Sequence, residues 1–132
     1  HPPPYVPEKP VSGGERTLLG RWGEAQVAEY LRKKGWTVVA SGYRTRFGEI
    51  DLIAENRKFL AFVEVKLRSG KGPVSGAEAV DARKQQRLRT TAECYLSTHP
   101  TEKQPRLDVA EVLAPDGVNT PAPKIRYLEN AF

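Results

Sequence analysis

Residues 48–68 read Gly-Glu-Ile-Asp-Leu-Ile-Ala-Glu-Asn-Arg-Lys-Phe-Leu-Ala-Phe-Val-Glu-Val-Lys-Leu-Arg, and this stretch decides the fold. Two apolar runs, at 50–54 and 59–67, flank the polar segment 55–58. Apolar runs on either side of a short polar segment are typical of a β-hairpin. The sequence therefore predicts two antiparallel strands here.

The position of the turn sets which side chains lie opposite each other. A turn built on residues 56–57 would place Asp51 opposite Phe62. The same turn would place Glu49 opposite Glu64. Because side chains alternate along a strand, four charged side chains would then share one face: Glu49, Asp51, Glu64 and Lys66.

Clustered carboxylates must become protonated, reach water or share a cation. Hard oxygen ligands at this spacing suit Mg²⁺ or Mn²⁺. A lysine beside such a site suits attack of water on a phosphodiester. The alternative is that Glu49 and Lys66 form an ordinary ion pair at a sheet edge, and the hairpin taken alone favours this alternative.

Composition bounds the remaining possibilities. The chain has 132 residues, a net charge of +5 and a pI near 9.5, which favour an anionic partner, nucleic acid first. No apolar run is long enough for a membrane span, and no signal-peptide pattern is present. Cys94 is the only cysteine, so no intrachain disulfide can form. We therefore expect a cytoplasmic protein, and a homodimer is compatible with these features.

A first helix is predicted over 17–34, ended by Gly35. Positions 24, 27, 28 and 31 form one stripe of this helix, so Glu24 lies among apolar side chains. A carboxylate there needs a partner, because unpaired burial is costly. Glu24 either pairs with Arg21 or Lys33 at the boundary of the helix or joins the acids of the hairpin.

A strand at 36–41 is predicted before the hairpin, followed by Arg44 and Arg46. These two arginines are candidate phosphate contacts or solvated loop charges. Residues 69–76 form a Gly-, Ser- and Pro-containing loop that includes Lys71, placed at the mouth of the site.

A second helix is predicted over 77–97, with an apolar stripe at Val80, Leu88, Ala92 and Tyr95. Lys84 interrupts that stripe, either by extending its side chain to water or by serving the site. Arg83 and Arg87 give the helix a basic flank suited to a phosphate backbone.

Strands at 106–113 and 124–128 complete the order α-β-β-β-α-β-β. We therefore predict an α/β fold in which helices flank a mixed central β-sheet. Residues 1–14 hold five prolines and read as a disordered leader, either a linker or a docking peptide. The domain then covers 15–132.

Three features now converge: Glu24 in the first helix, Gly48-Glu-Ile-Asp-Leu52 on one strand, and Phe62-Val-Glu-Val-Lys66 on the next. With the Lys84 helix and the terminal Asn-Ala-Phe, they resemble the YraN-like branch of the PD-(D/E)XK nuclease superfamily. That branch comprises predicted endonucleases related to archaeal Holliday-junction resolvases. The resemblance covers about residues 15–132 and implies a restriction-endonuclease-like fold. Ile50 stands where the superfamily motif usually has proline.

The resemblance implies a role for each matched residue. Asp51, Glu64 and the main-chain carbonyl of Val65 would bind the metal ion. Glu24 would bind a second ion or a metal water, and Glu49 would lie in the surrounding shell. Lys66 would orient or deprotonate the attacking water, and Lys84 would contact a phosphate. The candidate nucleic-acid contacts are Lys84, Arg83, Arg87, Arg44, Arg46 and Lys71.

The leading hypothesis is a Mg²⁺- or Mn²⁺-dependent DNA endonuclease, with selectivity for branched or junction DNA as one form of it. The alternative is a nucleic-acid-binding or assembly module on a nuclease fold with little or no turnover. A carboxylate-pair glycosidase ranks last, because it explains neither Lys66 nor the basic charge.

Overall fold

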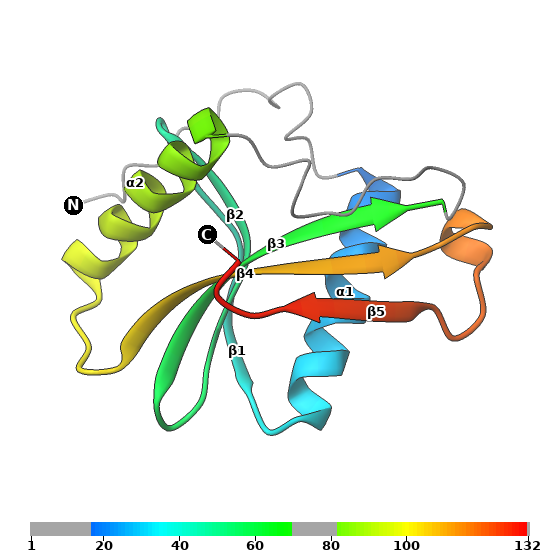
Figure 1. The fold of residues 1–132 in the computed structure, drawn as a ribbon, viewed down its shortest axis with the longest axis horizontal. Helices are drawn as coiled ribbons and strands as arrows, with labels where there is room; N and C mark the ends of the chain where they lie inside the picture. Colours follow the sequence, from blue (N-terminus) through cyan, green and yellow to red (C-terminus); the bar gives the residue numbers. More distant parts are fainter. Residues whose placement is uncertain (1–16, 70–81, 132) are drawn as a thin grey trace.

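The computed structural model describes residues 17–69 and 82–131, which form a mixed β-sheet with a helix on each face (Figure 1). In chain order the elements are α1 (Leu18–Lys33), β1 (Thr37–Thr45), β2 (Gly48–Glu55), β3 (Phe59–Arg68), α2 (Ala82–Thr98), β4 (Gln104–Leu113), the 3₁₀ turn η2 (Gly117–Asn119) and β5 (Lys124–Leu128). This order confirms the predicted α/β class. The leader at 1–14, Lys71 and the predicted helix start at 77 lie outside the described residues.

The sheet contains five strands in the order β1-β2-β3-β4-β5. Strands β1, β2 and β3 pair antiparallel, β3 pairs parallel with β4, and β4 pairs antiparallel with β5. Figure 1 shows the arrows of β3 and β4 pointing the same way and that of β5 pointing back. A parallel pair needs a crossover connection, and the segment containing α2 supplies it.

The register of the β2–β3 hairpin differs from the prediction by two residues. Ile53, rather than Asp51, lies opposite Phe62. The backbone N–H of Asn56 donates to the carbonyl of Phe59 at 3.0 Å, so the turn residues are 57–58. The Asn56 side chain explains the shift, because its Oδ1 accepts the backbone N–H groups of the second turn residue and of Phe59. A shift of two residues, unlike a shift of one, does not turn one strand over relative to the other.

Helix α1 is shorter than predicted by one residue at each end. The Thr17 side chain caps it by accepting the backbone N–H of Gly20 at 3.0 Å. Gly35 follows the helix with a φ of 93°, and the N–H of Trp36 reaches back to Leu31, as in a Schellman motif. The predicted stripe is confirmed: Glu24 is only 7% exposed and lies on the buried face of the helix.

Two apolar layers lie on the two faces of the sheet. The α1 layer contains Val27, Leu31 and Leu52, and the α2 layer contains Ile50 and Leu88. Strict alternation would place positions 50 and 52 of β2 on the same face, yet they pack in opposite layers. The alternation therefore breaks between them, at Asp51.

Strand β1 runs farther than predicted and ends at Thr45, so Arg44 belongs to an edge strand and Arg46 to the turn that follows. Strand β4 begins at Gln104, two residues earlier than predicted, and β5 matches the prediction. Among the described residues, no helix is both long and apolar enough to cross a membrane.

The buried carboxylate of Asp108 fastens the C-terminal segment to β4. Arg106 forms an ion pair with it at 3.1 Å, the Tyr127 hydroxyl donates to it at 2.6 Å and the backbone N–H of Asn130 at 2.8 Å. Asp108 is fully buried and is satisfied by these partners.

Candidate active site

A cleft of about 720 Å³ opens where the N-terminal half of α1, the break in β2, the second half of β3 and the first turns of α2 meet. Nine of the candidate site residues line this cleft together with the backbone position Val65: Glu24, Arg44, Arg46, Glu49, Asp51, Glu64, Lys66, Lys84 and Arg87. Residues predicted from four separate segments of the sequence therefore meet in one place. Arg83 does not line the cleft, and Lys71 lies outside the described residues.

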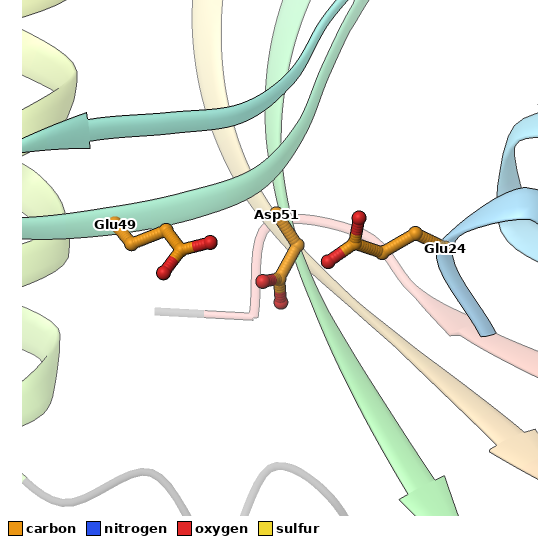
Figure 2. Close-up of side chains that lie close together, drawn as sticks. All are labelled: Glu24, Glu49 and Asp51. Atoms are coloured by element: carbon orange, nitrogen blue, oxygen red, sulfur yellow. The ribbon is translucent and has the colours of Figure 1, made fainter. Parts of the chain in front are cut away.

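Three carboxylates from two elements converge in the cleft. Each of Glu24, Glu49 and Asp51 contributes one carboxylate oxygen, and these oxygens all lie within 4.8 Å of one another. Figure 2 shows Asp51 between the other two, with Glu24 reaching from α1 and Glu49 from β2. Such a group of hard oxygen atoms could hold a divalent cation.

The electrostatic environment of Asp51 disfavours its charged form. Burial of the carboxylate and the negative charge of Glu64 raise its pKa well above the usual value, and Glu24 and Glu49 add to this. The backbone N–H of Val65 opposes the rise by donating to Asp51 Oδ2 at 2.7 Å. A cation held among these acids would restore the charged form.

Glu64 lies beside the three acids but holds two lysines. Its Oε2 atom is 3.2 Å from the Nζ of Lys66 and 2.9 Å from the Nζ of Lys84. Burial alone would lower the pKa of Lys84, but the charge of Glu64 and the hydrogen bond to it outweigh burial and raise this pKa. The side chain of Lys84 on α2 thus forms an ion pair with Glu64 on β3. The ammonium groups of Lys66 and Lys84 therefore lie in the cleft together with the carboxylates.

The arginines of the cleft are not equivalent. The guanidinium of Arg44 forms an ion pair with Glu49 at 3.1 Å, so it acts inside the acidic cluster. Arg46 and Arg87 are exposed and line the cleft, where an anionic ligand can reach them. Arg83 instead lines a neighbouring recess of about 330 Å³ that also includes Arg46 and Arg87.

Sequence reasoning missed the residues that hold the β1–β2 turn. Thr91 of α2 is fully buried and donates to the Arg87 carbonyl at 2.8 Å. A Cβ at Gly48 would approach the Thr91 hydroxyl to 3.2 Å, so glycine lets the turn sit close to α2. The Thr-Arg-Phe-Gly sequence at 45–48 is a turn signal that could have located this contact.

Fold and cleft together define a single-domain α/β protein with an acidic, lysine-flanked site, and this architecture is consistent with a restriction-endonuclease-like fold. The chain belongs to the uncharacterised protein family UPF0102, which it matches over residues 23–112. The matched region contains all described candidate site residues. The YraN-like resemblance is therefore confirmed at the level of the family.

Proteins named as UPF0102 proteins in several bacteria are similar to this chain. The protein from Synechococcus sp. (strain JA-3-3Ab) is 43% identical over 118 residues, which cover 86% of this chain and 90% of that protein. The protein from Alkaliphilus metalliredigens (strain QYMF) is 41% identical over 115 residues, or 86% of this chain and 96% of that protein. The chain therefore spans nearly the full length of these relatives.

Proposed function

We propose that this protein is a metal-dependent DNA endonuclease that hydrolyses phosphodiester bonds. The observation that carries the proposal is that one cleft holds two kinds of groups: three converging carboxylates, and two lysines that are paired with the neighbouring Glu64. A binding module that only holds phosphates has no need of a cluster of acids, because acids repel phosphates. Hydrolysis of a phosphodiester uses both kinds of groups: the carboxylates can hold a cation, and the lysines can face the substrate.

The residues present fit Mg²⁺ or Mn²⁺. The donor set of Glu24, Glu49 and Asp51 consists of carboxylate oxygens, which these hard ions prefer. Burial and the neighbouring acids raise the pKa of Asp51, so a cation bound beside it would stabilise its charged form. When bound, such an ion acts as a Lewis acid on a phosphoryl oxygen and makes water a stronger nucleophile at neutral pH. Asp51 and Glu24 belong both to this set and to the residues to which the family resemblance gives a metal-binding role.

The lysines would act on the substrate. Lys66 and Lys84 share one oxygen of Glu64, which keeps both ammonium groups at the wall of the cleft beside the acids. From there, Lys66 can orient the attacking water and stabilise negative charge that builds on the phosphoryl oxygens. Lys84 can hold the scissile or a neighbouring phosphate. Glu64 positions both side chains before the substrate arrives.

The exposed arginines extend the site toward a polyanion. Arg46 and Arg87 lie at the cleft, and the whole chain carries a net charge of +5. Phosphate contacts of this kind fix the position of a nucleic acid without reading its sequence. They support a nuclease that recognises shape or backbone in preference to base sequence.

Cleavage of labelled DNA by purified protein tests this function. Single-stranded, duplex, flap and four-way-junction substrates should be incubated with Mn²⁺, with Mg²⁺ and with EDTA. We expect cleavage of at least one substrate, dependent on the metal ion and lost in Asp51→Asn. The matched control is Glu29→Gln, which removes an exposed acid of α1 outside the cleft and should cleave as the wild type does. Equal cleavage by Asp51→Asn would exclude this cleft as the active site.

A further inference from the structure

The turn between β1 and β2 presents an aromatic ring at the edge of the active-site cleft. Among the described residues, the large hydrophobic side chains that are exposed include a single aromatic one, Phe47, with 38% of its surface accessible. Phe47 lines both the cleft and the neighbouring recess of about 330 Å³. Phe47 belongs to neither apolar layer of the sheet, so its ring is accessible to a ligand in the cleft or in the recess.

This turn is held in place by its own hydrogen bonds and by α2. The backbone N–H of Phe47 donates to the hydroxyl of Thr45 at 3.0 Å, and Thr45 is itself 5% exposed. Gly48 packs closely against Thr91 of α2, as described above. The turn that carries the Phe47 ring is therefore held in one conformation. Binding of a ligand to the ring would then cost less conformational entropy of the turn.

The surroundings of the ring are cationic and polar. The guanidinium carbon of Arg46 lies 5.1 Å from the centre of the Phe47 ring. Across the recess, α2 contributes Arg83 and Arg87 together with the amide of Gln86. Among the described residues that line this recess there is no acid, in contrast with the adjoining cleft. An aromatic face bordered by arginines is the arrangement that proteins use to bind single-stranded nucleic acid.

We propose that Phe47 stacks on an unpaired base of the substrate, in the recess between the β1–β2 turn and α2. Arg83 and Arg87 would then hold the phosphates of this nucleotide, and Gln86 can donate to or accept from the edge of the base. Stacked bases in a continuous duplex cannot present a free face, so the preferred substrate carries a single-stranded segment next to the cleavage point. This inference rests on the proposed nucleic-acid substrate and specifies its class.

Binding measured without a divalent cation tests the stacking contact separately from catalysis. Wild type, Phe47→Ala and Phe47→Trp should be titrated in EDTA with a short labelled oligothymidine and with a blunt duplex. Loss of a base–aromatic stack corresponds to a loss of affinity of at least about fivefold. We expect Phe47→Ala to lose this much for the single strand and less than about twofold for the duplex. Phe47→Trp should retain wild-type affinity.

Val118→Ala is the matched control, because Val118 has the same 38% exposure but lies in η2, away from the cleft and the recess. It should bind both DNAs as the wild type does. Melting temperatures should be equal for all variants, since the exposed ring contributes little to the core. Equal losses for single strand and duplex would overturn the stacking proposal, as would unchanged binding by Phe47→Ala. A change of oligomeric state in Phe47→Ala with unchanged DNA binding would identify the ring as a protein contact and would also overturn it.

The outcome for stacking can be separated from the outcome for catalysis. If the wild type cleaves DNA but Phe47→Ala binds single strands normally, the stacking proposal fails and the nuclease proposal stands. The wild type could instead show no cleavage while Phe47→Ala loses affinity for the single strand only. The stacking proposal would then hold, and the protein would be one that binds DNA without cleaving it.

Discussion

The side chain of Asp51 takes the place of a missing backbone contact: its Oδ2 accepts the backbone N–H of Val65 at 2.7 Å. The last regular pair between β2 and β3 at this end is Leu52 with Val63, and Asp51 and Val65 lie one and two residues beyond it. The bond therefore joins the strands where their ladder stops. It also fixes the carboxylate at the point where β2 changes face, among three other acids. A structural contact and a candidate metal ligand are thus the same group.

This double role predicts the pH dependence of stability. The pKa of Asp51 in the folded protein lies well above the usual value near 3.9. The folded state thus holds this proton more tightly than the unfolded state, and stability is lost as the pH rises through the raised pKa. Asp51→Asn removes the cost of burying a negative charge beside other acids. It also keeps a side-chain oxygen that can accept the Val65 N–H.

Thermal denaturation in EDTA measures this effect. We expect Asp51→Asn to melt about 2–8 °C above the wild type at pH 8, with the difference shrinking toward pH 4. Mn²⁺ should raise the melting temperature of the wild type and leave that of the variant unchanged. A variant that melts below the wild type at pH 8 would contradict the raised pKa of Asp51.

Metal affinity distinguishes the ligands within the cluster. Calorimetric titration with Mn²⁺ should give at least about tenfold weaker binding for Glu49→Gln, since Glu49 is one of the three converging carboxylates. Asp51→Asn combined with Glu64→Gln should abolish binding. Glu29→Gln should bind as the wild type does. If Glu49→Gln binds Mn²⁺ with wild-type affinity, Glu49 is not a metal ligand. It would then only surround the ligands, as the sequence predicted.

DNA affinity should depend on the arginines of α2 through charge alone. Arg83→Gln with Arg87→Gln should weaken binding to different sequences alike and reduce the salt slope by about two, because each phosphate contact releases about one counterion. Arg32→Gln is the control, since Arg32 is an exposed residue in the last turn of α1 and away from the cleft. An unchanged slope in the double variant would remove α2 from the DNA-binding surface.

The Asp108 network should affect stability and not function. Tyr127→Phe removes a 2.6 Å hydrogen bond to a buried carboxylate and should lower the melting temperature by about 4–10 °C. Tyr43→Phe is the matched control, because the buried Tyr43 hydroxyl has no hydrogen-bond partner within the part of the chain that the structure describes. It should leave stability nearly unchanged. A loss of Mn²⁺ binding in Tyr127→Phe would show that the network supports the cleft.

Periodicity and spacing predicted the order of elements because each helix and strand carries its own apolar pattern. The burial of Glu24 followed from its place on a helical stripe, and this was correct. The turn of the hairpin was wrong by one position, because the Asn56 side chain selects the turn and local composition does not reveal it. Glu49 and Glu24 converge next to the break in β2, and this break leaves no periodic signal in the sequence.

Cleavage by Lys66→Ala is the measurement that most directly separates an enzyme from a binding module. The ammonium of Lys66 lies 3.2 Å from Glu64, and removing it leaves the ion pair of Glu64 with Lys84 at 2.9 Å in place. The fold and the charge balance of Glu64 should therefore survive, and Mn²⁺ affinity should stay within about threefold of the wild type. Lys103→Ala is the control, because it removes a lysine from a similar 3.1 Å ion pair with Glu55 away from the cleft.

We predict that Lys66→Ala lowers the single-turnover cleavage rate by about a hundredfold or more, with DNA affinity only slightly reduced, because Lys66 acts on charge that develops in the transition state. Lys103→Ala should cleave at the wild-type rate. Cleavage by Lys66→Ala at the wild-type rate would contradict the account and favour a binding module whose cleft does no chemistry.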